Sequence, residues 1–324
     1  MEENQDGGSY MGNYFEIHYH AIKYPIDSEE NRGLRNAQLG AIYVISSFFT
    51  LNKKMAAIVV MPTGSGKSAV LMLVPYLIRK QRVSIVTPSK MVRGQIAEDF
   101  SKLRTLCIAN VFDMSIERPK VFELEHLCVE EYEKDSEQAD VIIATPNCAR
   151  SLSETKWAKK NIDLVEVDEA HHTPAKTWKQ ILVNLSEAAH VLFTATPFRL
   201  DRKELMGEIA YDYPLSKAYE DGIFGEIQFI PVESGKDNDL RIAKRAEEIL
   251  LNDRKIGYEH CLMVRTDTKI NSQKLERLYE DNTSLKLLKI DSSMSNSKIN
   301  NVLKLLHSKK NRWDNLCRYA WRRV

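Results

Sequence analysis

A glycine-rich turn that ends in a lysine and a serine carries the clearest chemistry in this sequence. The segment MPTGSGKS (61–68) lies between an apolar run of strand type and a stretch with helical spacing, although Met61 replaces the first glycine of the usual pattern. In such a turn, backbone N–H groups close around phosphates, the lysine reaches the β- and γ-phosphates, and the serine hydroxyl meets Mg²⁺. A purely structural turn would need no lysine followed by serine. We predict a phosphate site with Mg²⁺ at Ser68, formed by Thr63, Gly64, Ser65, Gly66, Lys67 and Ser68.

An acidic pair follows another apolar run about a hundred residues later, in VDEAHH (167–172). Asp168 at the end of a strand suits Mg²⁺ coordination through water, and Glu169 beside it suits acceptance of a proton from an attacking water. Alone, such a pair is often only a helix N-cap. Together with the glycine-rich turn it indicates hydrolysis of a nucleotide phosphate.

Two threonines in VLFTATP (191–197) form the third candidate group. Thr194 and Thr196 suit a coupling role, in which a hydrogen-bond change at His171 passes to another domain. The alternative is a strand end that is capped by threonines.

The composition is that of an ordinary globular protein. The 324 residues include 46 Lys+Arg and 45 Asp+Glu, giving a net charge of +1, and 43% are hydrophobic, which excludes a disordered tail or a coiled coil. Because this charge gives no general signal for a polyanion, nucleic-acid binding must be argued from local sites. Five cysteines without a C-x-x-C pair predict reduced thiols and a cytoplasmic location. No apolar run approaches the roughly 18 residues of a membrane span, so we expect no membrane contact.

The elements that would position these residues alternate between strand and helix. Continuous apolar runs predict buried strands, and stretches such as 68–80 and 90–103 have helical spacing. This order predicts an α/β fold with a parallel sheet. The charged segment 116–138 predicts a surface helix and loop. The apolar runs are 56–62, 83–88, 139–146, 162–171 and 191–197.

A second alternation begins after a polar, turn-rich connector. Three further runs predict strands, at 227–233, 260–266 and 284–291. The expected organisation is an N-terminal extension at 1–30, an ATP-binding domain at 31–200, a connector at 201–226, and a partial second domain at 227–324 with an aberrant tail at 315–324.

In ordered motifs from about 31 to 300, the sequence resembles the superfamily-two helicases and translocases. The resemblance is to the DEAH-type group that contains the helicase subunits of type I and type III restriction enzymes. It implies two RecA-like domains, with ATP and Mg²⁺ as cofactors. It also implies that LRNAQLGAI (34–42) recognises adenine through Gln38. The catalytic residues implied are Lys67, Asp168, Glu169 and His171.

The resemblance extends to the motifs that contact nucleic acid. VTPSKMVRGQ (86–95) and ATPN (144–147) look like the two motifs that lie along a single strand. Hydroxyls, amides and helix N-termini bind phosphates without reading bases, so binding should be independent of sequence; a capped helix is the alternative for each motif. The segment 198–222 resembles the restriction-subunit group, which favours DNA and a nuclease or methyltransferase partner. The implied contact residues are Thr87, Arg93, Gln95, Thr145 and Asn147.

The second domain departs from the family pattern. The family supplies an arginine finger from its last motif, and no Q-x-x-G-R-x-x-R-like segment occurs in this sequence. Such an arginine contributes about 10³–10⁵ in rate. We therefore expect this chain to bind nucleotide far better than it hydrolyses it. The full-length motor would couple ATP hydrolysis to movement on DNA. The alternative is a nucleotide- and DNA-binding remnant or regulatory module without motor activity.

The last eight residues, Cys317 to Val324, are compatible with a frameshift. Permitted codons for CRYAWRRV and a following stop encode V-D-M-L-G-E-G-F when they are read one base later, and that string resembles the family's next motif. We expect the coding DNA to continue in the shifted frame into a glycine- and arginine-containing motif. Sequencing these codons tests the expectation, which fails if they do not yield V-D-M-L-G-E-G-F.

Overall fold

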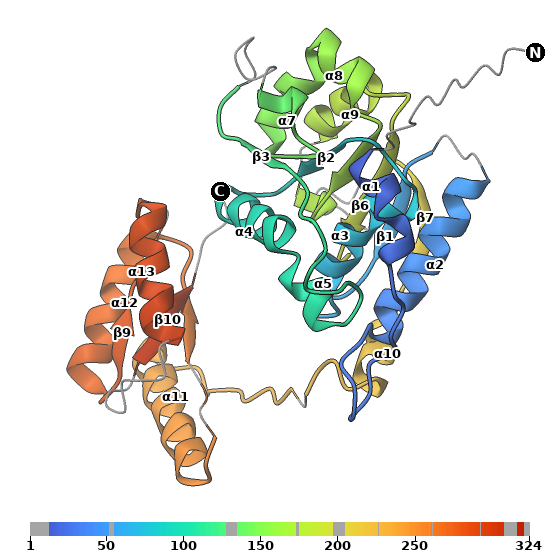
Figure 1. Cartoon of the computed structure of the whole chain (residues 1–324). Coiled ribbons are helices and arrows are strands. Elements are labelled where there is room, and N and C mark those ends of the chain that lie inside the picture. The colour runs from blue at the N-terminus through green and yellow to red at the C-terminus, as the bar shows by residue number, and fades with distance from the viewer. Residues whose placement is uncertain are drawn as a thin grey trace, which may run out of the picture. The chain divides into compact units, whose positions relative to one another are not determined.

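The computed structural model describes residues 13–51, 55–127, 135–172, 175–196, 205–225, 227–258, 260, 262–291, 293–307 and 316–320. The chain forms two compact units, Met1–Glu226 and Ile227–Val324 (Figure 1). Among the described residues, no helix is both long enough and apolar enough to cross a bilayer.

The first unit is built on a seven-stranded sheet, which confirms the predicted α/β class. The strand order is β3-β4-β2-β5-β6-β1-β7, and every pairing is parallel. The four strands β1, β2, β4 and β5 are buried along their whole length because helices cover both faces of the sheet. The strands are β1 (Ala57–Val60), β2 (Val83–Val86), β3 (Val121–Leu124), β4 (Val141–Ala144), β5 (Leu164–Val167), β6 (Ala189–Thr194) and β7 (Glu208–Asp212).

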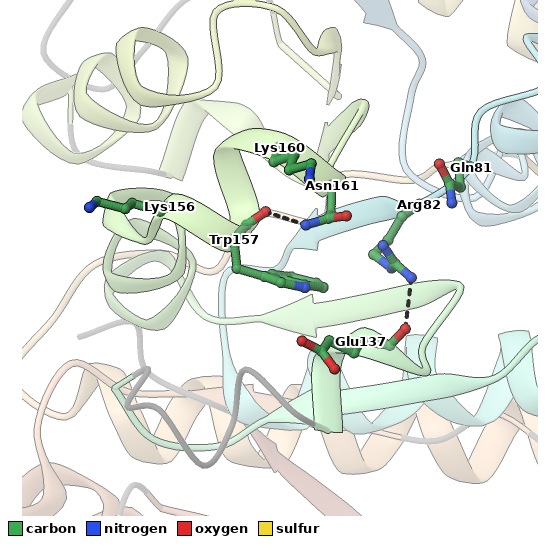
Figure 2. Close-up of a pocket in the computed structure, with 7 residues that line it drawn as sticks. All are labelled: Gln81, Arg82, Glu137, Lys156, Trp157, Lys160 and Asn161. Atoms are coloured by element: carbon green, nitrogen blue, oxygen red, sulfur yellow. Dashed lines mark hydrogen bonds between the residues drawn. The ribbon is translucent and has the colours of Figure 1, made fainter.

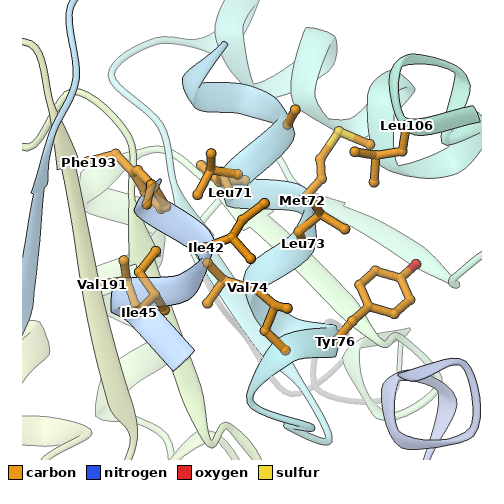
Figure 3. Packing of buried hydrophobic residues seen from close by; sticks show 14 of the residues in the cluster. Ile42, Ile45, Leu71, Met72, Leu73, Val74, Tyr76, Leu106, Val191 and Phe193 are labelled. Carbon is orange, nitrogen blue, oxygen red and sulfur yellow. The ribbon is translucent and has the colours of Figure 1, made fainter. Parts of the chain in front are cut away.

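One face of this sheet carries the larger apolar cluster. Helix α3 (Lys67–Leu77) is buried from Ala69 to Leu77, with the helices α2 (Asn36–Thr50), α4 (Lys90–Lys102) and α5 (Arg104–Ile108) packed in the same cluster. Figure 3 shows side chains of α2 and α3 meeting Val191 and Phe193 of β6. Because α3 starts at Lys67, this packing fixes the residue on which the predicted phosphate site depends.

The opposite face is covered by a second group of helices. These are α7 (Pro146–Glu154), α8 (Lys156–Asn161) and α9 (Ala175–Asn184). Their apolar residues pack against the alternate residues of the same strands, including Ile142, Val165 and Leu192. The remaining described helices of this unit are α1 (Tyr14–Ile17), η1 (Tyr19–Ala21), η2 (Ala170–His172) and α10 (Leu215–Glu220).

The two edge strands, β3 and β7, lie in segments for which the sequence predicts other structures. The segment 116–138, expected as surface helix and loop, contains β3, and the expected connector 201–226 contains β7 and α10. Residues 121–123 of β3 and most of β7 are only partly buried. An edge strand has a partner on one side only and tolerates charged side chains, so it lacks the continuous apolar run that marks a central strand.

The second unit has a three-stranded parallel sheet of order β8-β10-β9. Its small apolar cluster includes Ala243, Leu250 and Tyr279. Its elements are α11 (Asn238–Lys255), β8 (Met263–Arg265), α12 (Lys269–Asn282), β9 (Lys286–Leu288), α13 (Asn296–His307) and β10 (Leu316–Ala320).

One expectation for the second unit differs from the structure. The run 227–233 is not a strand; Phe229 is 90% exposed, and no described strand pairs with this segment. An apolar run becomes a strand only where a neighbouring strand satisfies its backbone. Residues 316–320, in the C-terminal tail, form the middle strand β10, and the expectation of an aberrant tail at 315–324 stays a prediction.

Candidate nucleotide-binding and hydrolysis site

Strand order brings the predicted chemical groups to one edge of the first sheet. The strands β5, β6 and β1 are neighbours, and all three run in the same direction. Asp168 follows β5, Thr194 ends β6, and the turn before Lys67 follows β1. Residues far apart in sequence therefore meet at the carboxyl ends of adjacent strands, where open α/β sheets bind their ligands.

The glycine-rich turn has the backbone that a phosphate loop requires. Gly64 and Gly66 have φ values of 88° and 92°, a region that side chains other than glycine rarely adopt. Thr63 and Gly64 are exposed, whereas the buried Ser65 hydroxyl donates to the Pro62 carbonyl at 2.7 Å. The backbone around Lys67 is thus preformed.

Two residues at the start of α2 hold this loop. Arg35 Nη1 donates to the Gly64 carbonyl at 2.9 Å, and Gln38 Nε2 donates to the Gly66 carbonyl at 3.1 Å. Gln38 Oε1 also accepts from the Arg35 backbone N–H at 2.9 Å. Gln38 is only 8% exposed. Its amide, which the family resemblance assigns to adenine, is here used to position the loop.

A chain of polar contacts runs from Lys67 to the end of β6. Lys67 Nζ lies 2.5 Å from Glu169 Oε1, and Glu169 Oε2 lies 3.4 Å from His171 Nδ1. The same ring nitrogen is 2.9 Å from Thr194 Oγ1, which donates to the Thr196 carbonyl at 2.6 Å. The sequence-predicted groups Lys67, Glu169, His171 and Thr194 therefore form one connected set.

The backbone of Glu169 is strained. Its φ is +48°, which costs a residue other than glycine of order 1–3 kcal/mol and persists where the surrounding structure requires it. In this conformation the carboxylate of Glu169 lies between Lys67 and His171.

Asp168 provides the test of whether a cation fits this site. Burial raises the pKa of its carboxyl to about 6, and the nearby Lys67 ammonium acts in the opposite direction. A buried carboxylate that is not balanced by enough positive charge nearby is a suitable ligand for a divalent cation. Ser68 presents an exposed hydroxyl at the start of α3. An open cavity of about 1100 Å³ is lined by the glycine-rich turn, Gln38, Asp168 and Glu169, so the residues fit a nucleotide with Mg²⁺.

Two of the five predicted nucleic-acid contacts are buried and already bonded. The Thr87 hydroxyl is fully buried and points to the carbonyls of Ser89 and Ala144. Arg93 is 4% exposed; its guanidinium binds Glu123 at 3.0 Å and Glu125 at 2.5 Å. In this structure the hydrogen bonds of Thr87 and Arg93 are made inside the protein, and phosphate contact by either residue stays a prediction.

The other three predicted contacts remain accessible. Gln95 is exposed on α4 and lines the nucleotide cavity. Thr145 precedes α7, with its hydroxyl 3.4 Å from Cys148 Sγ, and Asn147 is exposed in the first turn of α7. Nucleic-acid contact by these three residues stays a prediction.

Sequence reasoning missed the residues that anchor α2. Asp221, at the end of α10, accepts from Asn36 Nδ2 at 3.0 Å, accepts from the Tyr213 hydroxyl, and pairs with Lys217 at 3.2 Å. These bonds hold the pKa of Asp221 below its usual range. Asn36 and Arg35 lie within the quoted segment 34–42, but nothing in their spacing indicates a partner 185 residues away.

The fold and site define a P-loop nucleotide-binding protein. Residues 31–199 match the family described as "Type III restriction enzyme, res subunit". The chain belongs to this family, and so to the superfamily-two helicases.

Similar proteins agree with this assignment. "Putative helicase 22" of Sulfolobus islandicus filamentous virus is 28% identical over 216 residues, which cover 62% of this chain and 35% of the viral protein. The match thus spans about a third of that relative's length. The structure of the ATP-dependent type ISP restriction-modification enzyme LlaBIII bound to DNA covers 90% of this chain and 24% of its own, with 16% identity and a TM-score of 0.55, which supports the RecA-like fold.

The observed role of Gln38 leads to a prediction about base selectivity. Gln38→Ala removes the hydrogen bonds that this side chain makes with the Arg35 backbone N–H and the Gly66 carbonyl. Nucleotide affinity should therefore fall about tenfold, equally for ATP and GTP. Titration of fluorescent ATP and GTP analogues measures both constants. Ser47→Ala, at an exposed position of α2, is the matched control and should change neither. A loss confined to ATP would instead assign Gln38 to adenine.

Proposed function

We propose that the first unit binds MgATP and hydrolyses it to drive movement on DNA. The observation that carries the proposal is the connected set Lys67–Glu169–His171–Thr194 beside Asp168. Mg²⁺ bound with the nucleotide would neutralise phosphate charge next to Ser68 and Asp168.

The residues suggest how hydrolysis proceeds. When nucleotide binds, the Lys67 ammonium leaves Glu169 and contacts the β- and γ-phosphates. The Glu169 carboxylate is then free to accept a proton from the attacking water. His171 contacts both Glu169 and Thr194, so a change at Glu169 reaches the end of β6 and Thr196. This is the coupling role proposed for the two threonines.

The choice of DNA over RNA rests on the family. Its members are described as restriction-enzyme subunits, and the type ISP neighbour was solved with DNA. A nuclease or methyltransferase subunit is the partner we propose, in the cytoplasm, where the buried thiols of Cys107 and Cys148 stay reduced. The second candidate function is a nucleotide- and DNA-binding module without motor activity.

The nucleotide site is tested by two substitutions with different effects. Lys67→Ala should abolish ATP binding, whereas Glu169→Gln should preserve binding and lower any hydrolysis by about 10²–10⁴, because only the proton acceptor is lost. Calorimetric titration and phosphate release measure the two steps. Lys90→Ala, an exposed lysine at the start of α4, is the control. Equal ATP affinity in wild type and Lys67→Ala would contradict the assignment.

Nucleic-acid binding is tested by its salt dependence. Contacts to phosphates should give weak binding that is independent of sequence and decreases as salt increases. Fluorescence anisotropy with labelled single strands of unrelated sequence, at two salt concentrations, measures this. Strong preference for one sequence, or an affinity unchanged by salt, would argue against the motor proposal.

A further inference from the structure

A second hollow lies at the amino ends of the strands of the first sheet, opposite the nucleotide site. Arg82 directly precedes β2, Glu137 precedes β4, and Trp157 lies on α8 before β5, so these residues gather at the amino ends of the strands. The hollow has a volume of about 490 Å³ (Figure 2). The nucleotide site is at the carboxyl ends, and the two sites share no residue. We call this second site the basic hollow.

Arg82 is fixed in the basic hollow by carbonyls and an aromatic ring rather than by an ion pair. Its Nε donates to the Ala139 carbonyl at 2.7 Å, its Nη2 donates to the Glu137 carbonyl at 2.9 Å, and its guanidinium lies 5.1 Å from the centre of the Trp157 ring. In the described part of the chain, no carboxylate forms an ion pair with it. Carbonyls and an aromatic face orient a cation but do not cancel its charge.

The carboxylates near Arg82 have other partners. Asp163 accepts from the backbone N–H groups of Gln81 and Arg82, both at 2.9 Å, and Asp140 accepts from the Lys120 backbone N–H at 2.7 Å. Hydrogen bonds from the backbone do not cancel the charge of a carboxylate, and Asp140, Asp163 and Glu137 all act on the Arg82 guanidinium. We therefore assign no ligand contact to Arg82.

Two lysines add to the charge of the basic hollow. Lys156 and Lys160 are exposed, lie one turn apart on α8 and therefore share a face. Neither forms an ion pair with any described residue. With Arg82 they give three cations against the one carboxylate, Glu137, that lines the hollow. Because nearby carboxylates act on Arg82, the two lysines without an ion pair are the groups that favour an anionic ligand.

The ligand class follows from the other groups in the basic hollow. The indole of Trp157 is half-buried, and the side-chain amide of Asn161 lies near it, whereas Gln81 lies beyond Arg82 (Figure 2). Asn161 Nδ2 donates to the Trp157 carbonyl at 2.8 Å, which fixes that amide. A flat aromatic surface, fixed polar groups and unpaired cations together suit a base with its phosphate, and the volume suits one nucleotide. An acidic peptide would use the cations but not the indole.

We propose that the basic hollow binds one nucleotide unit of a single nucleic-acid strand. The phosphate contacts Lys156 and Lys160, and the base packs against the part of the Trp157 indole that Arg82 does not cover. The basic hollow is at the amino ends of the β-strands, opposite the nucleotide site. A nucleic-acid strand held there lies outside the proposed motor track and anchors the protein independently of ATP hydrolysis.

Photo-crosslinking locates the strand directly. A short single strand that contains 5-iododeoxyuridine is irradiated with the full chain, without ATP, and the adduct is mapped by mass spectrometry. We expect an adduct within 156–161. Trp157→Phe should keep binding, whereas Trp157→Leu should lose the adduct. An adduct confined to Gln95, Thr145 or Asn147 would overturn the proposal while supporting the motor track.

Measurements of affinity for a nucleic-acid strand test the role of the two lysines. The double variant Lys156→Gln/Lys160→Gln should weaken strand binding about five- to tenfold. The control is Lys159→Gln/Lys179→Gln, which removes two exposed lysines that do not line the basic hollow. Equal affinity for the two double variants would overturn the proposal, as would competition by polyglutamate that is stronger than competition by an unlabelled strand. ATP binding should be unchanged in both, so failure here is distinct from failure at Lys67.

Discussion

The parallel adjacency of β5, β6 and β1 is the constraint on which the rest of the first unit depends. It requires crossover connections, and these supply helices that bury both faces of the sheet. It also places the ends of three strands side by side. Lys67, Glu169 and Thr194 can therefore lie within one chain of contacts, although 127 positions separate the first from the last. A shift in strand order would separate the cation from the carboxylates.

The start of α2 links this site to the segment that follows β6. Arg35 and Gln38 hold the glycine-rich turn, and their neighbour Asn36 is held by Asp221 after β7 and α10. Tyr211 of β7 adds packing, since its ring occupies the space that a side chain at Gly40 would need. The position of the phosphate loop thus depends on the segment that precedes the second unit. The contacts responsible, the Asn36–Asp221 hydrogen bond and the packing of Tyr211 against Gly40, all lie within the first unit.

The sequence predicted the central part of the fold and the chemical groups well, because both leave local patterns. Buried parallel strands produce continuous apolar runs, and the phosphate loop produces glycines before Lys67. Edge strands and long-range polar contacts leave no such pattern. Arg93 illustrates this: its neutralising partner Glu123 lies on β3, an edge strand that was expected as helix and loop. The role of Arg93 could not be separated from phosphate binding until that strand was placed.

The charges of the nucleotide site also explain why a cation should accompany the nucleotide. Glu166, under the site on β5, is fully buried, and neither of its carboxylate oxygens has a hydrogen-bond partner. Burial raises its pKa well above the usual range, because the charged form is disfavoured away from water. Asp168 and Glu169 still outnumber Lys67. When Lys67 turns to the phosphates, both carboxylates face an anion, and the repulsion is relieved only if positive charge enters with the nucleotide.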